Sequence, residues 1–180
     1  IDLESEDRTP RVLIPGFESN FSYIGNKGPR FFFVTNENAP LQKVVAIDIT
    51  SDDLAREVII PERETKLDGV SMVGGKLVAE YLVDAKSEIS IHALDGSEIR
   101  KVALPGIGSA GGFGGDADDN EVFYFFSSFN RPTTIYKYDL DSGASDIWAQ
   151  PEVAFNPDDY TVEQKFYASK DGTKVPMFLV

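Results

Sequence analysis

The sequence alternates between apolar stretches and short polar turns, and this alternation recurs at a nearly constant interval. Three long apolar runs lie at Arg30–Thr35, Lys76–Val83 and 121–126. They are rich in aromatic and β-branched residues and are bounded by Gly, Asn or Asp, a pattern typical of buried strands. Phe32 precedes Leu77 by 45 positions, and Leu77 precedes Phe123 by 46. We therefore expect three buried strands that belong to one repeating unit.

Shorter strand candidates surround each long run at the same spacing. A segment that begins with serine precedes each run, at 22–25, 71–74 and 109–112. An Asp-bearing apolar segment follows each run, at 46–49, 91–95 and 136–140. After a polar turn comes a fourth candidate, at Arg56–Ile60, 98–103 and Ser145–Ala149. Four short strands per unit of roughly 45 residues are typical of a β-propeller blade.

The repeat predicts an all-β fold, an incomplete β-propeller of about three four-stranded blades plus part of a fourth. Blades are expected at 17–60, 67–104 and 107–149, and residues 1–14 are expected to end a preceding blade, with 11–14 as its outermost strand. Because propellers close a ring of ~4–8 blades, we expect the chain to be a truncated fragment. It opens in mid-pattern without Met, and its first residues lack the features of a signal peptide. Open apolar blade faces are expected to favour self-association.

The repeat ends after Pro151. Residues 150–160 are rich in Pro and Asp, as expected of a linker. Two further strand candidates, at 161–169 and 174–180, flank an Asp-Gly turn that favours a hairpin. We expect residues 161–180 to open another domain.

Five stretches in register with the repeat resemble the prolyl oligopeptidase family of serine peptidases. Residues 168–178 are similar to the segment that opens the α/β-hydrolase domain of that family, and Pro176, Met177 and Phe178 favour its prolyl-specific branch over the branch that cleaves after basic residues. The other four stretches lie in the same order as in the family, at 35–40, 58–62, 104–109 and 127–132.

The resemblance implies a seven-bladed propeller that caps a Ser-His-Asp active site and admits only short peptides. The nucleophile and its partners would then lie beyond Val180, so no catalytic residue is assigned, and this segment alone is expected to be inactive. Its expected partners are short proline-containing peptides, through the parent enzyme, and the α/β-hydrolase domain of the same protein. The alternative is a non-catalytic propeller that binds a peptide or glycan.

Four residues are candidates for a functional role. Ser22, Ser71 and Ser109 begin the segments expected to be innermost in each blade, so they are predicted to line the central channel along which substrate passes. Arg131, in the Ser-Phe-Asn-Arg-Pro loop, is predicted to lie at the face that meets the hydrolase domain.

Two motifs mimic known sites but lack the required context. Residues 106–111 match G-x-G-x-x-G, yet the glycine-rich stretch that follows cannot open the helix a dinucleotide site needs. Ser109 resembles a nucleophile elbow, but Ile107 replaces the required glycine. A nucleophile also needs a base, and the single histidine, His92, is expected to be an ordinary strand residue.

Composition narrows the partners further. The formal charge of −13 disfavours nucleic acid and anionic membranes, and the absence of cysteine excludes disulfides and zinc–thiolate sites. The acidic stretches 116–121 and 139–143 lack the ligand spacing of a calcium loop and are expected to be hairpin turns. We expect no metal and no cofactor. The compartment stays open between cytoplasm and periplasm.

Overall fold

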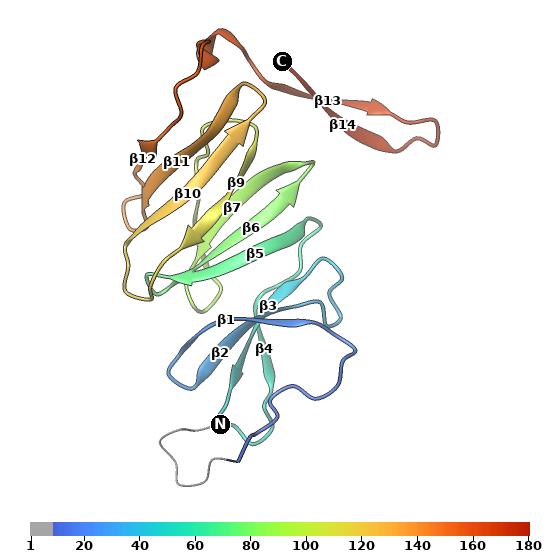
Figure 1. Ribbon diagram of the computed structural model, residues 1–180. Coiled ribbons are helices and arrows are strands. Elements are labelled where there is room, and N and C mark those ends of the chain that lie inside the picture. Colours follow the sequence, from blue (N-terminus) through green and yellow to red (C-terminus); the bar gives the residue numbers. More distant parts are fainter. Residues whose placement is uncertain (1–8) are drawn as a thin grey trace. The chain divides into compact units, whose positions relative to one another are not determined.

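The computed structural model describes residues 9–180, and strands dominate it (Figure 1). The described residues form three four-stranded antiparallel sheets and one two-stranded hairpin. They divide into two compact units, one that ends at Pro61 and one that runs from Glu62 to Val180. No helix among the described residues is long and apolar enough to cross a membrane.

The first unit contains one four-stranded meander. Its strands are β1 (Phe21–Lys27), β2 (Arg30–Thr35), β3 (Lys43–Asp48) and β4 (Arg56–Ile60), and they lie side by side in chain order. Phe33, Val45 and Ile47 form a buried cluster against which Ile14 and Phe21 pack. Burial of these side chains, at about 1.5–3 kcal/mol each, is what holds the middle strands in the extended state that their apolar runs predict.

The second unit contains two further meanders. The first comprises β5 (Lys66–Val73), β6 (Lys76–Val83), β7 (Lys86–His92) and β8 (Glu98–Lys101). The second comprises β9 (Ser109–Gly114), β10 (Glu121–Ser128), β11 (Arg131–Asp139) and β12 (Ser145–Ala149). In both sheets the strands lie in chain order, so that each sheet has the strand arrangement of a propeller blade.

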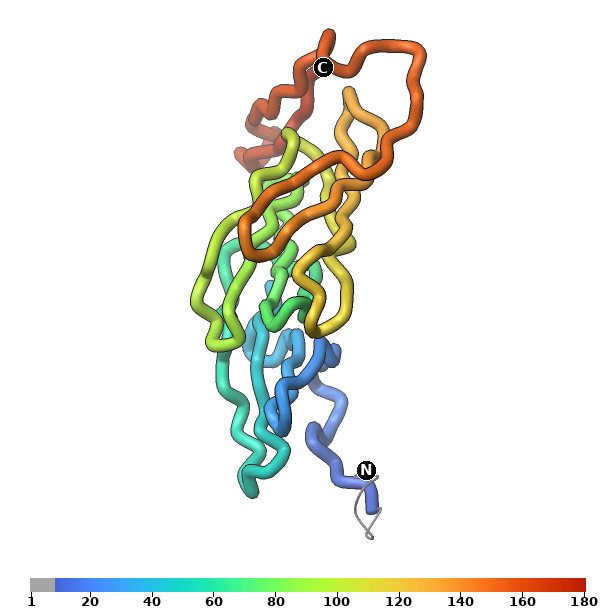
Figure 2. Tube along the Cα trace, turned by 90° about the vertical axis from the view of Figure 1, so that its left-hand side faces the viewer, coloured from blue at the N-terminus to red at the C-terminus, as the bar shows by residue number. Residues whose placement is uncertain are grey.

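The two sheets of the second unit pack face to face around one core (Figures 1 and 2). The first sheet contributes aliphatic side chains such as Val78 and Ile91, and the second contributes mainly aromatic ones. Tyr124 stacks on Phe113 at a centroid distance of 4.7 Å and on Tyr136 at 5.1 Å. Stacked aromatic pairs stabilise a core by about 0.5–1.5 kcal/mol beyond the area they bury.

The two faces of β10 differ in a way that the sequence does not predict. Val122, Tyr124 and Phe126 are buried, whereas Phe123 and Phe125 are 37% and 39% exposed. The expectation of a buried strand at 121–126 therefore holds for one face of the strand only. The core of the second unit covers only one face, so the strand shows the period of two that is typical of a one-sided sheet.

A linker and a hairpin follow the last sheet (Figure 1). The linker contains one turn of 3-10 helix, η1 (Pro157–Asp159), whose first turn is capped by the Asn156 side chain. The hairpin comprises β13 (Glu163–Ala168) and β14 (Lys174–Leu179), joined by a turn in which Gly172 has a φ of +86°. The predicted hairpin is confirmed.

One predicted strand is absent. Residues 11–14 were expected to form the outermost strand of a preceding blade, but they are irregular. An outermost strand exists only by pairing with its inner neighbour, and the segment expected to supply that neighbour, residues 1–3, lies outside the described residues. Residues 11–14 are held instead by the Arg11 guanidinium, which donates to the carbonyl oxygens of Ile49 (2.6 Å) and Ser51 (3.0 Å).

Candidate functional site

The three candidate channel serines all lie on the first strand of a sheet. Ser22 on β1 and Ser109 on β9 are exposed, and Ser71 on β5 is half-buried. Each of these strands pairs with one neighbour only, so it has a free edge. The structure therefore leaves the serines in reach of solvent, while their role as a channel lining stays a prediction.

Ser109 lines a cavity of about 240 Å³ near the ends of β9 and β10. The cavity wall combines hydroxyl groups with apolar side chains, among them Phe129 and Phe178. Gly108 is required here, because a Cβ at this position would lie 2.1 Å from the carbonyl oxygen of Ser127. The cavity is thus a small mixed pocket whose wall includes the hairpin.

Arg131 contacts the linker that leads to the hairpin. Its guanidinium forms an ion pair with the Asp158 carboxylate in η1. The neighbouring Asn130 donates from Nδ2 to the carbonyl oxygens of Pro157 (3.1 Å) and Tyr160 (2.8 Å). The β10–β11 turn therefore fixes the end of the linker. The position of Arg131 relative to a hydrolase domain stays a prediction.

A second set of contacts fixes the hairpin itself. The Gln164 amide on β13 donates to the carbonyl oxygen of Asp84 (2.6 Å) and accepts from Lys86 Nζ (3.1 Å). Asp84 and Ala85 form the β6–β7 turn with φ values of +49° and +65°, a conformation that non-glycine residues adopt rarely. Sequence reasoning did not identify these contacts, because Gln164 and Asp84 are 80 positions apart.

Glu80 on β6 carries a half-buried carboxylate between the two sheets of the second unit. Its Oε1 accepts a hydrogen bond from the Gly112 amide on β9 at 3.3 Å. Burial raises the pKa of this carboxyl above its ordinary value, and the nearby Asp68 charge adds to the rise, while the backbone N–H groups of Gly112 and Phe113 oppose it. The sequence shows Glu80 only as one polar position within an apolar run.

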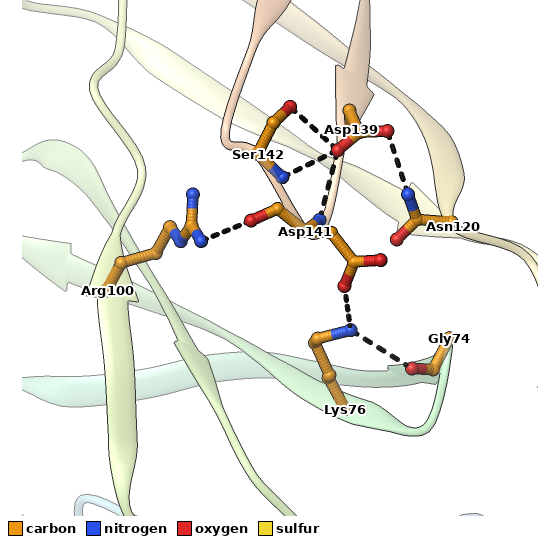
Figure 3. A network of polar contacts seen from close by, with 7 residues as sticks. All are labelled: Gly74, Lys76, Arg100, Asn120, Asp139, Asp141 and Ser142. Atoms are coloured by element: carbon orange, nitrogen blue, oxygen red, sulfur yellow. Dashed lines mark hydrogen bonds and ion pairs between the residues drawn. The ribbon is translucent and has the colours of Figure 1, made fainter.

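A polar network joins the two sheets of the second unit at the end that lies opposite the hairpin contacts (Figure 3). Lys76 Nζ pairs with the Asp141 carboxylate at 2.9 Å and also contacts the Gly74 carbonyl oxygen at 3.4 Å. Arg100 Nη2 donates to the Asp141 carbonyl oxygen at 2.5 Å. Two cations from the first sheet thus hold the β11–β12 turn of the second.

Asp139, unlike Asp141, stabilises the turn itself. Asp139 Oδ1 accepts from the amides of Asp141 (3.1 Å) and Ser142 (2.6 Å) and from the Ser142 hydroxyl (2.7 Å). Asn120 Nδ2 donates to the other oxygen at 2.8 Å (Figure 3). The Ser142 hydrogen bonds lower the pKa of the Asp139 carboxyl. The interpretation of this stretch as a hairpin turn is confirmed.

His92 is a buried residue at the end of β7, as expected. Its Nδ1 lies 3.0 Å from the Gly96 carbonyl oxygen, which can only accept, so Nδ1 carries a proton. In the neutral ring Nε2 then accepts from the Ser90 hydroxyl at 2.8 Å. Both ring nitrogens are engaged in local hydrogen bonds, which explains why a histidine is tolerated in this strand.

Comparison with known proteins identifies relatives over more than nine-tenths of the chain. The sequence profile described as prolyl oligopeptidase, N-terminal beta-propeller domain, matches residues 1–151. A prolyl endopeptidase of Elizabethkingia miricola is 39% identical over 173 residues, covering 93% of this chain and 24% of that protein. The dual function macrocyclase-peptidase POPB of Amanita bisporigera is 36% identical, covering 94% of this chain and 24% of its own length.

Solved structures of prolyl oligopeptidases superpose on the chain over most of its length. A prolyl endopeptidase studied for the role of inter-domain dynamics in catalysis and specificity superposes with a TM-score of 0.84 at 41% identity, over 96% of this chain and 26% of its own. The apo structure of prolyl oligopeptidase B from Galerina marginata gives a TM-score of 0.86 at 32% identity, over 93% of this chain and 25% of its own. The chain thus spans about a quarter of the length of these relatives.

Proposed function

Because the chain belongs to the prolyl oligopeptidase family of serine peptidases, in which it matches the N-terminal β-propeller domain, we propose that it is the gating propeller of an enzyme that hydrolyses short peptides after proline. The observation that carries this proposal is a match to prolyl endopeptidases over 93% of the chain with 39% identity. The sheet order of each meander, which is that of a propeller blade, supports it independently.

In this proposal the chain supplies a gate and a scaffold, and the catalytic residues belong to another part of the parent enzyme. The meanders at 17–60, 67–104 and 107–149 are blades, 150–160 is the linker, and 161–180 begins the α/β-hydrolase domain. The contacts of Gln164 and Asn130 support this division, because they attach the hairpin and linker to the ends of the blades by a few polar bonds.

The candidate residues acquire roles in this arrangement. Ser22, Ser71 and Ser109 line the channel as small polar groups that keep it hydrated, which their solvent-accessible positions on edge strands support. Arg131 lies at the face toward the hydrolase domain, where its ion pair with Asp158 holds the linker. The 180-residue chain by itself is inactive.

The test is the activity of the parent polypeptide, obtained by extending the reading frame past Val180. We expect a downstream domain with a G-x-S-x-G motif followed by Asp and then His, and hydrolysis of a chromogenic peptide with proline before the leaving group. The isolated chain serves as the control and should release no chromophore. A reading frame that lacks such a domain would instead favour a propeller that only binds a peptide or glycan.

A further inference from the structure

Glu80 occupies a notch where the inner strands β5 and β9 adjoin. Glu80 pairs with Gly69 on β5 and accepts the hydrogen bond of Gly112 on β9. A Cβ on Gly111 would lie 3.0 Å from Glu80 Oε2, tighter than ordinary contact, and a Cβ on Gly69 would lie 3.8 Å from the same oxygen. The absence of a side chain at Gly111 is therefore what gives the carboxylate its space, whereas a Cβ at Gly69 would be in ordinary contact.

Both inner strands are also irregular at these glycines. The register of β5 on β6 shifts between Leu67 and Gly69. The register of β9 on β10 shifts beside Gly111. Glycine within a strand, next to a bulge, commonly marks a place where another group approaches the backbone closely. Here two such places flank one carboxylate.

The cations of the surrounding sheet are engaged elsewhere. In β5 to β8 and their turns, Lys66 pairs with Asp68, Lys76 with Asp141 and Lys101 with Glu88, while Lys86 donates to Gln164 and Arg100 to the Asp141 carbonyl. Glu80 has lost part of its hydration, and the backbone N–H groups of Gly112, in a long hydrogen bond of 3.3 Å, and of Phe113 replace only part of it. A carboxylate in this condition gains from any cation that can reach it.

We propose that the Glu80 notch binds a cationic group of a peptide, a guanidinium or an ammonium, at the inner edge of the blades. The inference rests on the proposed function, which brings peptides to the inner strands, and it adds a preference for basic residues in those peptides. A guanidinium fits because it donates through a planar fork, and a carboxylate offers two acceptor oxygens in one plane.

The experiment measures peptide binding to the chain by NMR. The capped peptide acetyl-Gly-Arg-Gly-amide is titrated into labelled protein, and the same peptide with citrulline in place of arginine gives the uncharged comparison. We expect the arginine peptide to shift the amide signals of Gly111 and Gly112. We also expect it to lower the pH at which the Glu80 carboxyl carbon titrates, because a bound cation favours the ionised form.

Two matched pairs of variants locate the effect. Glu80→Gln keeps the acceptor for Gly112 but loses the charge, so binding of the arginine peptide should weaken by about tenfold or more. The control is Glu64→Gln, which removes the same charge from an exposed position. This variant should bind the peptide as the original chain does. Gly111→Ala crowds the carboxylate and should also weaken binding. Gly106→Ala, with no heavy atom within 4 Å of the added Cβ, should not.

Three results would overturn the inference. They are no shift of the amide signals with the arginine peptide, equal shifts with the arginine and citrulline peptides, or binding of the arginine peptide that Glu80→Gln leaves unchanged. None of them bears on the proposed function, which is decided separately by the proline-specific hydrolysis of the parent polypeptide. Conversely, if the parent polypeptide were inactive but the chain still bound the arginine peptide, the Glu80 site would stand and the peptidase assignment would be wrong.

Discussion

The guanidinium of Arg100 lies over Gly143, close enough that a Cβ on Gly143 would come within 2.3 Å of Arg100 Nη1. Arg100 belongs to one blade-like sheet of the second unit and Gly143 to the turn of the next. Gly143 also has a φ of +79°. One glycine thus permits both the turn and the approach of the cation that joins the two sheets.

Gly143→Ala should therefore destabilise the chain through two effects. The left-handed backbone conformation costs about 1–2 kcal/mol for a residue with a Cβ, and displacement of Arg100 removes its bond to the Asp141 carbonyl. Gly75→Ala is the control, because Gly75 has a φ of +65° but no atom within 4 Å of the added Cβ. Urea unfolding should show a larger loss of unfolding free energy for Gly143→Ala; equal losses would mean that the Arg100 contact contributes nothing.

Arg131→Glu should release the linker from the β10–β11 turn. The change places a negative charge beside Asp158, where the structure has an ion pair. We expect faster hydrogen exchange at the amides of Asp159 and Tyr160, whose hydrogen bonds close the η1 turn. The exchanged pair Arg131→Glu with Asp158→Arg should restore part of the protection. Exchange that is unchanged by the single reversal would show that the ion pair does not hold the linker.

The apolar face formed by Phe123, Phe125 and Trp148 should promote self-association of the chain. Phe123 and Trp148 are in ring contact at 5.3 Å, and all three side chains are more than a third exposed. Contiguous exposed aromatic surface favours association in water. Sedimentation velocity at micromolar concentration should show species larger than the monomer, and Phe125→Lys should reduce them. A monomer throughout that range would contradict the expectation.

The strands could be predicted from the sequence because each apolar run and its flanking turn residues recur at a nearly constant spacing. The runs Arg30–Thr35 and Lys76–Val83 were predicted with the bounds that the structure has, since aromatic and β-branched residues between turn residues leave few alternatives. Residues 11–14 are irregular although their composition favours a strand, so an apolar composition alone does not form one.

The contacts that define the candidate sites were not predictable in the same way. Glu80 is significant because Gly111, on a strand of the neighbouring sheet, leaves space beside it. That relation depends on which face of β6 meets β9, and this is decided by packing of the two sheets. The Gln164 contact with Asp84 likewise joins segments that no repeat relates. Arg131 was identified from its loop, but its partner Asp158 was not.

Glu80 and Asp139 should give opposite pH dependences of stability, and Glu80 is the more informative. Its pKa is raised in the folded chain, first by burial, with Asp68 from β5 adding to the effect and the Gly112 N–H opposing it. The stability that this group contributes is therefore fully present below its unfolded pKa and is lost as pH rises through the folded pKa. Glu80→Gln removes this loss, so the variant should gain stability relative to the original chain as pH rises from about 4 to 7.

Asp139 provides the contrast within the same unit. Hydrogen bonds from the Ser142 amide and hydroxyl lower the pKa of its carboxyl, so its contribution is present above the unfolded pKa and is lost as pH falls through the folded one. Asp139→Asn should therefore cost stability at neutral pH and progressively less in acid. Urea midpoints measured across this range for both variants test the two signs together. If the stability of Glu80→Gln relative to the original chain did not rise between about pH 4 and pH 7, the Gly112 and Phe113 amides would already compensate the buried carboxylate, and it would have no need of an external cation.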